Sequence, residues 1–325
     1  MKAIVQDRYG SADVLRLADI DVPSPGAGQV LVQVRAAGVD PGVWHLMTGL
    51  PYVVRLGYGL RRPRDRVRGM DLAGVVTAVG PGVTGLIPGD EVYGTGVGSF
   101  AEYTVASAGR LAPKPATLSF EQAAAVPISG QTALAAVRDA ARVRPGHRVL
   151  VIGAGGGVGS YTVQLARAAG AHVTGLCGPT KLDLVRRLGA DEVVDYTHVD
   201  LPEHRYDAVI DTAGNRSLSR LRRALTPAGV LVLVGGEAHG GRWLQGFDRQ
   251  LRALALSPVV GQRLVPLMNK ESTENLMALT ALIETGQITP VVDRTWPLAG
   301  VPDAIRQLKG GHATGKSVIT VPLPR

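Results

Sequence analysis

The chain has one cysteine, few aromatic residues and no long apolar run. The single thiol, Cys177, excludes an internal disulfide and also excludes the four-cysteine lobe that would hold a structural zinc ion. No stretch is apolar over the length that a membrane-spanning helix needs, and residues 1–5 begin a strand pattern rather than a signal peptide. We therefore expect a soluble, cytoplasmic protein with no membrane partner.

The net charge of +8 admits nucleic acid as a partner, but 42 glycines with only 4% aromatic residues fit an α/β enzyme better. The basic residues cluster most tightly in residues 55–68, which hold six arginines and one acid, Asp65. Such a run is either a solvated loop or a rim that attracts an anionic substrate or a cofactor phosphate.

The most informative stretch is residues 148–170, RVLVIGAGGGVGSYTVQLARAAG. A β-branched apolar run leads into a glycine cluster and then into a helix pattern with an apolar face at Val163, Leu165 and Ala166. A second strand pattern follows at residues 172–176. This order predicts half of a nucleotide-binding βαβ unit, whereas a flexible glycine loop would lack the flanking elements.

The glycine turn is predicted to bind the diphosphate of a dinucleotide. Free N–H groups at a helix start can hold a diphosphate only where no Cβ blocks its approach. In the register Ala154-x-Gly156-x-x-Gly159, alanine replaces the first glycine of the usual G-x-G-x-x-G pattern. We assign Gly156 to close approach of the backbone to the diphosphate, and Gly159 to packing of the helix against the strand.

The residues after the second strand indicate which dinucleotide is bound. An NAD site usually carries Asp or Glu there to bind the ribose 2′-hydroxyl. This chain reads CGPTK over residues 177–181, and the next carboxylate, Asp183, should already lie in the following helix. Thr180 and Lys181 can donate to a 2′-phosphate, so the sequence predicts NADP(H). The alternative for Lys181 is a solvated lysine at a helix start.

Two kinds of pattern divide the chain into an α/β protein with two domains. Short strands with Gly- and Pro-rich turns, typical of a small barrel or sandwich, give way at Ser119 to a helix, a break at Pro127 and a second helix near Gly130. Alternating strands and helices then predict a doubly wound parallel sheet. The predicted domains are residues 1–123 with 262–325, whose tail returns to complete the first domain, and residues 124–261.

One predicted helix, residues 242–256, has an apolar stripe that we interpret as core packing rather than as a ligand site. Its members are Trp243, Leu244, Phe247, Leu251 and Leu254.

The whole chain resembles the zinc-independent quinone oxidoreductase branch of the medium-chain dehydrogenase/reductase superfamily. The stretches that carry the resemblance are QVLVQVRAAGVDPGVWHLMTG, DLAGVVTAVGPGVTG, PGDEVYG, SFAEY, AAAVPISGQTAL, GAGGGVGSYTVQLARAAGAHV, RRLGADEVVDYT and GKSVITV. The resemblance implies a GroES-like β-barrel catalytic domain, a Rossmann domain and a homodimer. We expect residues 231–233 and 258–260 to form the dimer edges.

The resemblance also implies the residues of the cofactor site. The diphosphate would meet Gly156, Gly157, Val158 and Gly159. The adenosine 2′-phosphate would meet Gly178, Thr180, Lys181 and Tyr196. The residues near the nicotinamide or the cleft beside it would be Thr132, Ala213, Gly214, Val234 and Gly235.

Zinc-dependent relatives carry a cysteine near position 40 and a histidine near position 70. This chain has Asp40 and Met70 there, followed by Asp71, and no His or Cys where a third ligand is expected. We therefore expect a site without metal.

Residues 40–43 depart from the quinone oxidoreductase pattern, which has an asparagine followed three residues later by an aspartate. This chain has Asp40 and Val43, so an amide has become a carboxylate and a carboxylate has become apolar. Either one structural charge has moved, or the substrate is not a simple quinone. Candidate donors to the acceptor oxygen are His45, Tyr52 and a water held by Asp40. The alternative for His45 is a structural histidine.

The predicted activity is NADPH-dependent transfer of hydride to a quinone, or to the activated C=C bond of an α,β-unsaturated carbonyl. One alternative is a metal-free alcohol dehydrogenase, although nothing in the sequence evidently polarises an alkoxide. Another is a dinucleotide-fold binding protein with a nucleic-acid or structural role, which the positive charge suggests. We expect a small-molecule quinone or enone substrate and no nucleic-acid partner.

Overall fold

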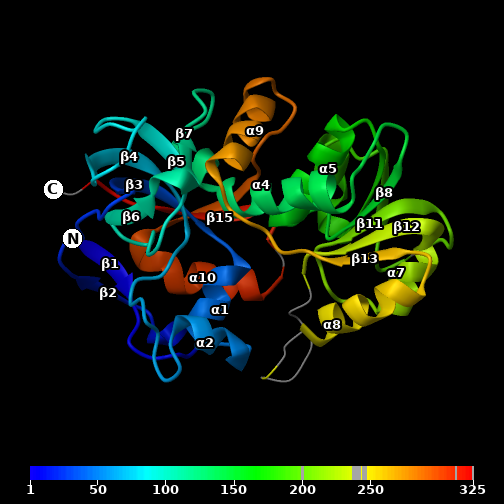
Figure 1. Ribbon diagram of the computed structural model, residues 1–325, viewed down its shortest axis with the longest axis horizontal. Helices are drawn as coiled ribbons and strands as arrows, with labels where there is room; N and C mark the ends of the chain where they lie inside the picture. Colours follow the sequence, from blue (N-terminus) through cyan, green and yellow to red (C-terminus); the bar gives the residue numbers. More distant parts are fainter. Residues whose placement is uncertain (199–200, 236–242, 244–246, 312, 324–325) are drawn as a thin grey trace. The chain divides into compact units, whose positions relative to one another are not determined.

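The computed structural model describes residues 1–198, 201–235, 243, 247–311 and 313–323 (Figure 1). The chain divides into unit 1, Met1–Gln131 with Glu271–Arg325, and unit 2, Thr132–Lys270. The predicted domain boundaries at 123/124 and 261/262 stay a prediction. Among the helices of the described residues, none is both long and apolar enough to cross a membrane.

Unit 1 is built on β strands from both ends of the chain. Strand β1 (Lys2–Val5) pairs antiparallel with β2 (Arg16–Asp19). A larger sheet has the order β14 (Val292–Pro297), β15 (Lys316–Thr320), β3 (Gln29–Val39), β4 (Asp71–Val79), β5 (Glu91–Thr95) and β7 (Leu111–Pro113), and β6 (Tyr103–Ser107) also pairs with β3. The predicted return of the C-terminal tail to the first domain is confirmed, because β15 pairs with β3.

Helices complete unit 1 around an apolar core. They are α1 (Pro41–Thr48), α2 (Arg55–Tyr58), α3 (Phe120–Ala124), α9 (Thr273–Glu284) and α10 (Val301–Lys309), while α4 (Pro127–Leu134) crosses the division between the units. Alternate residues of β3 face inward, as its period-two pattern requires. Val34, Val43 and Ile305 join β3, α1 and α10 in one buried cluster.

Helix α4 begins earlier than the sequence predicts. Its first residue is Pro127 rather than a residue near Gly130. Proline is favoured at the first position of a helix because it lacks an N–H that the helix would leave unbonded. The N–H of Ile128 donates to Oδ1 of Asp71 at 2.9 Å, so a buried carboxylate satisfies the next free donor. A proline that reads as a break therefore marks the helix start.

Unit 2 contains a six-stranded parallel sheet. Its order is β10 (Glu192–Asp195), β9 (His172–Cys177), β8 (Arg148–Ile152), β11 (Tyr206–Asp211), β12 (Leu225–Leu233) and β13 (Arg263–Pro266). The helices α5 (Gly157–Ala168), α6 (Leu182–Arg187), α7 (Leu218–Ala224) and α8 (Phe247–Leu256) connect the strands. Figure 1 shows α5 on one face of this sheet and α7 and α8 on the other. The predicted doubly wound Rossmann sheet is confirmed by this strand order.

Two predictions about unit 2 are wrong. Residues 231–233 are not an edge, because β12 lies between β11 and β13 and these residues are fully buried. The stripe of the predicted helix 242–256 is not core, because Phe247, Leu251 and Leu254 are 41 to 56% exposed. Only Ala253 of α8 is buried. Apolar spacing predicts a helix face but not what covers it.

The rest of that stripe has two outcomes. Trp243 is 74% exposed and precedes α8. Leu244 lies outside the described residues, so its predicted place in the core is not tested.

Candidate functional site

The glycine turn of unit 2 leaves backbone N–H groups open at the start of α5. Strand β8 ends at Ile152, and Gly153 turns the chain with a φ of +80°, where a Cβ would lie 2.5 Å from Oγ1 of Thr212. Gly156 precedes α5, and no side chain accepts from the first turn of this helix. Residues 156–158 are half-buried. Such a helix start can bind an anion through its N–H groups and its dipole.

The two predicted glycine roles correspond to two different surroundings. A Cβ on Gly159 would lie 2.0 Å from the carbonyl oxygen of Gly153 and 2.9 Å from Cα of Ala154, so only glycine allows this helix to approach the turn so closely. A Cβ on Gly156 would meet only the Gly153 oxygen, at 3.3 Å. The space over Gly156 is therefore open to a ligand.

Lys181 and Tyr196 lie beside the turn, at the carboxyl ends of β9 and β10. A Cβ on Gly155 would lie 2.8 Å from Cδ of Lys181, so the lysine stem passes directly over the glycine backbone. A Cβ on Gly178 would lie 3.3 Å from the Tyr196 ring, which is half exposed. The structure thus brings Gly178, Lys181 and Tyr196 to the same edge of the sheet.

The other described residues at this edge of the sheet include no carboxylate at the end of β9. Thr180 is exposed. Asp183 lies in α6, as predicted, and accepts from Arg186 at 2.8 Å. Strand β9 itself ends at Cys177, whose thiol has its pKa raised to about 11 by burial. A lysine, rather than a carboxylate, is therefore the charged group beside the glycine turn at the end of β9.

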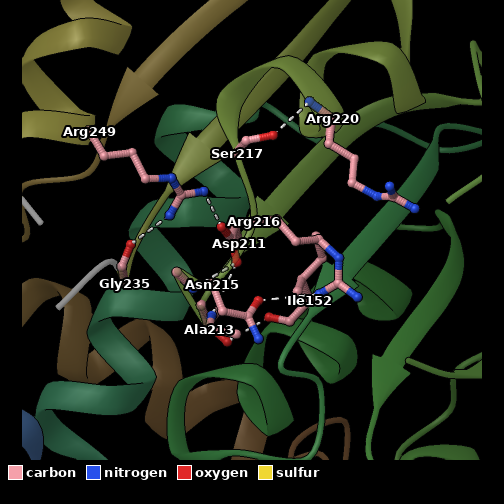
Figure 2. A network of polar contacts seen from close by, with 11 residues as sticks. Ile152, Asp211, Ala213, Asn215, Arg216, Ser217, Arg220, Gly235 and Arg249 are labelled. Carbon is pink, nitrogen blue, oxygen red and sulfur yellow. Dashed lines mark hydrogen bonds and ion pairs between the residues drawn. The ribbon is translucent and has the colours of Figure 1, made fainter. Parts of the chain in front are cut away.

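A second group of predicted residues is joined by a buried carboxylate (Figure 2). Asp211 ends β11 and has no exposed surface. Its Oδ1 accepts from the N–H groups of Ala213 at 3.2 Å and Gly214 at 3.0 Å. Its backbone carbonyl accepts from Val234 at 3.0 Å and from Gly235 at 3.2 Å. The four predicted residues thus surround one aspartate.

Arg249 of α8 completes this network, as Figure 2 shows. Its Nη2 donates to Oδ2 of Asp211 and its Nη1 donates to the carbonyl oxygen of Gly235 at 3.4 Å. The Arg249 side chain is only 12% exposed. Thr132, the last predicted cofactor residue, lies in α4, and Nδ2 of Asn269 is 3.5 Å from its hydroxyl oxygen.

Asp40 caps α1 in unit 1. Its Oδ1 accepts from the N–H of Gly42 at 2.7 Å. The residue is 2% exposed, and its Oδ2 is buried without a hydrogen-bond partner among the described residues. Burial raises the pKa of the Asp40 carboxyl above its usual range, and the nearby Lys316 charge opposes this shift only in part.

Lys316 and Asp71 form a buried ion pair beside Asp40. Nζ of Lys316 donates to Oδ2 of Asp71 at 2.9 Å, and both side chains are almost fully buried. Burial raises the pKa of Asp71 to about 6, with Lys316 opposing the shift and the Asp40 charge adding to it. The Lys316 ammonium is therefore bonded to Asp71, while its charge also acts on the Asp40 carboxyl.

His45 and Tyr52 are each held by neighbours from the same part of unit 1. Nδ1 of His45 lies 2.6 Å from the carbonyl oxygen of Leu50, which makes Nδ1 the protonated nitrogen, and the Trp44 ring meets the imidazole edge-on. The Arg55 guanidinium lies 4.7 Å from the Tyr52 ring centre. The hydrogen bond orients His45 as a structural histidine would be oriented, and its catalytic role stays a prediction.

The arginine run of residues 55–68 is partly structural. Arg55 also contacts the ring of Tyr9, Arg66 donates to Asp7 at 2.7 Å, and Arg68 is buried. Arg61, Arg62 and Arg64 are exposed. The run therefore combines anchored arginines with a solvated group.

Two family models match the chain. The alcohol dehydrogenase GroES-like domain matches residues 26–116, and the zinc-binding dehydrogenase domain matches residues 188–319. A chloroplast envelope quinone oxidoreductase homolog from Arabidopsis thaliana is 32% identical, over 98% of this chain and 98% of that protein. The chain belongs to the quinone oxidoreductase branch of the medium-chain dehydrogenase/reductase superfamily. Its GroES-like and Rossmann folds are thereby confirmed, although the sheet of unit 1 pairs as an open path rather than a closed barrel.

Two further relatives match this quinone oxidoreductase homologue over nearly its whole length. The 2-methylene-furan-3-one reductase of Solanum lycopersicum is 35% identical over the whole chain and 80% of that protein. The solved structure of mycobacterial Rv1454c complexed with NADPH has a TM-score of 0.82 and 27% identity, covering 98% of this chain and all of the other.

Sequence reasoning about this quinone oxidoreductase homologue missed Asp211, Arg249 and the pairing of Lys316 with Asp71. Asp211 carried a signal, since it ends the apolar strand pattern YDAVID at the edge where parallel sheets bind ligands. Arg249 carried none, because its partner lies 38 positions away. Within the part of the chain that the structure describes, no group of three or more His, Cys, Asp or Glu side chains is placed to hold a metal ion.

Proposed function

We propose that this chain is an NADPH-dependent reductase that transfers hydride to a quinone or to the activated C=C bond of an α,β-unsaturated carbonyl. The observation that carries the proposal is the Lys181 stem over the glycine turn, beside a helix start with open N–H groups. An ammonium at this place favours a 2′-phosphate over a bare ribose hydroxyl.

The names of the relatives support the substrate class and the cofactor. One relative is named for quinones, one for 2-methylene-furan-3-one, which is an enone, and one structure contains NADPH. Quinones and enones share an electron-poor carbon conjugated to a carbonyl oxygen. A site that delivers hydride to that carbon can therefore reduce both classes of substrate.

Each group of residues has a defined task in this reaction. When bound, the reduced nicotinamide supplies the hydride. The N–H groups at the start of α5, next to Gly156, Gly157, Val158 and Gly159, bind the diphosphate. Lys181, Thr180 and Tyr196 hold the adenosine 2′-phosphate and its surroundings. The turns at Ala213–Gly214 and Val234–Gly235, together with Thr132, position the nicotinamide half.

The acceptor oxygen gains negative charge as hydride arrives, and a hydrogen-bond donor would stabilise that charge. The candidates are His45, Tyr52 and a water held by Asp40. No zinc is needed for this polarisation, and two observations support a metal-free site. Asp71, which follows Met70, is already bonded to Lys316 and to the Ile128 N–H. Oδ1 of Asp40 is bonded to the Gly42 N–H.

We also propose a homodimer with small-molecule partners, no nucleic-acid partner and a cytoplasmic location. Strand β13 ends the sheet of unit 2, and Leu251, Leu254 and Val259 beside it are more than half exposed. An apolar surface next to a sheet edge fits an interface between two copies, although Val259, in the predicted edge 258–260, lies in the 3-10 helix Ser257–Val259 rather than in a strand.

The activity is tested by NADPH oxidation with 1,4-quinones, 2-alkenals and cyclic enones, run beside NADH on protein treated with EDTA. We expect NADPH to be consumed with at least one acceptor class and NADH to be used poorly. Failure to bind either coenzyme, together with salt-sensitive RNA binding, would favour the nucleic-acid alternative. Oxidation of alcohols with no reduction of enones or quinones would favour the alcohol dehydrogenase.

The cofactor preference is tested by Lys181→Ala. Losing the ammonium should raise the KM for NADPH about tenfold or more and leave the KM for NADH nearly unchanged, because only NADPH carries the 2′-phosphate. Arg187→Ala, which removes an exposed cation from α6, is the matched control and should change neither. Equal effects of Lys181→Ala on both coenzymes would contradict the assignment.

A further inference from the structure

We propose that Arg249 is a positioning residue for the nicotinamide half of the cofactor and acts through Asp211. The inference rests on the proposed NADPH-dependent function. It assigns to α8, an element outside the glycine turn, control over one half of the cofactor site.

Asp211 is the point where two backbone turns are tied together. Its side chain accepts from the N–H groups of Ala213 and Gly214, and its backbone carbonyl accepts from those of Val234 and Gly235, which follow β12. The second turn is closely packed against the first, because a Cβ on Gly235 would lie 2.4 Å from the carbonyl oxygen of Thr212. Asp211 therefore contacts the first turn through its carboxylate and the second turn through its backbone, and Arg249 contacts both the carboxylate and the Gly235 carbonyl.

Arg249 is the charged partner of the buried Asp211 carboxylate. Asp211 has no exposed surface, and its two other side-chain partners are neutral N–H groups. A buried carboxylate that loses its counter-ion is left uncompensated, and its side chain is expected to shift. Such a shift weakens the hydrogen bonds from Ala213 and Gly214. The second Arg249 contact, to the Gly235 carbonyl, holds the other turn directly.

The diphosphate turn is fixed by different contacts. The N–H groups of Gly153 and Ala154 both donate to the carbonyl oxygen of Leu176, and Gly159 packs against Gly153. Oγ1 of Thr212 donates to Ile152, which touches the base of this turn but does not involve Arg249. Loss of Arg249 should therefore disturb the nicotinamide half and spare the diphosphate and 2′-phosphate subsites.

The test compares NADPH with 2′-phospho-ADP-ribose, which has the diphosphate and the 2′-phosphate but no nicotinamide. In Arg249→Met, the Kd for NADPH should rise about tenfold or more. The Kd for 2′-phospho-ADP-ribose should stay within about twofold of its value in the unaltered protein. Lys181→Ala should show the converse pattern, weakening both ligands together. Calorimetry measures both constants for the unaltered protein and for each variant.

Three controls separate positioning from general destabilisation. Arg252→Met removes an exposed arginine from the same helix and should leave both constants unchanged. Arg249→Lys keeps the charge but loses one of the two contacts. Its Kd for NADPH should lie between those of the unaltered protein and of Arg249→Met. In an Asp211→Asn background, adding Arg249→Met should change the NADPH Kd less than it does in the unaltered protein, because the carboxylate that Arg249 balances is gone and only its Gly235 contact remains to be lost.

The outcomes distinguish this inference from the proposed function. Equal weakening of both ligands in Arg249→Met, or full additivity with Asp211→Asn, would overturn the positioning role. If the unaltered protein binds both 2′-phospho-ADP-ribose and NADPH, the proposed function stands even when Arg249→Met fails to show the expected difference. If it binds neither, the proposed function fails first.

Discussion

The two carboxyl oxygens of Asp40 have different surroundings. One oxygen caps α1, and the other is buried without a hydrogen-bond partner among the described residues. The nearest positive charge, on Lys316, is already paired with Asp71. A second buried carboxylate beside one ammonium is disfavoured, so the neutral form of Asp40 is favoured in the folded chain.

Replacing Asp40 by asparagine tests this electrostatic arrangement. Because the folded-state pKa of Asp40 is raised above 3.8, its contribution to stability is complete below that pH and is lost as the pH rises through the folded pKa. Asparagine keeps the cap and cannot ionise. Asp40→Asn should therefore leave the melting temperature unchanged at pH 4 and raise it by about 2–4 °C at pH 8.

The opposite result has an equally definite meaning. A variant that melts lower than the unaltered protein at pH 8 would show that ionised Asp40 balances Lys316. The charge that quinone oxidoreductases typically carry three residues later, where this chain has the buried Val43, would then have moved to Asp40.

At the scale of single residues, what the sequence predicted depended on local spacing. The places of Gly156, Gly159 and Lys181 follow from a strand, a turn and a helix that are consecutive in the chain. Asp211 and Arg249 come from separate elements, and only the folded sheet brings them together. A carboxylate at the end of an apolar strand was visible in the sequence, but its counter-ion was not.

The glycine turn is the element in which shape and ligand binding can be separated. Gly159 is required by packing, because a Cβ there would overlap the Gly153 carbonyl, whereas Gly156 has open space above it and an ordinary extended backbone. The two glycines therefore serve different purposes within one motif.

Alanine at each position should give contrasting results. Gly159→Ala should destabilise the protein by about 3 kcal/mol, because the helix must move away from the strand. Gly156→Ala should change stability by less than about 1 kcal/mol and yet weaken NADPH binding at least about tenfold, because its methyl group occupies the diphosphate approach. Thermal melting and calorimetry check both, and a stable Gly159→Ala protein would contradict the packing role.

The errors in predicting elements have a common cause. The sequence predicts a break at Pro127, where the structure has a helix start, because the outcome depends on whether a carboxylate, here Asp71, accepts from the next N–H. The periodicity of the α8 stripe predicts an apolar face but does not show what covers it. Both depend on contacts with distant segments that a local pattern does not contain.

The whole molecule is expected to assemble through the exposed face of α8. Leu251→Glu with Leu254→Glu places charges on that face and should convert the dimer to a monomer, as measured by size exclusion with light scattering. Leu56→Glu in α2 alters a side chain of greater exposure, 72%, and is the matched control. An unaltered protein that is already monomeric, or a dimer that survives both changes, would contradict the proposed interface.

Fold class could be read from the sequence at this scale, because alternation of strands and helices is a property of the chain itself. The open pairing of the unit 1 sheet and the burial of β12 between its neighbours could not. Strand neighbours are set by which edges meet in space, and the patterns of residues 231–233 and 258–260 are equally apolar.

The pairing of β15 with β3 also sets an order of events on the ribosome. Since β15 pairs with β3, this sheet cannot be completed until residues 316–320 have been synthesised, by which time the strands of unit 2 have already emerged. The nascent chain therefore carries an unfinished sheet edge throughout translation of its middle. Chaperones that act during synthesis should therefore bind the unpaired edge of β3 rather than the nucleotide-binding half.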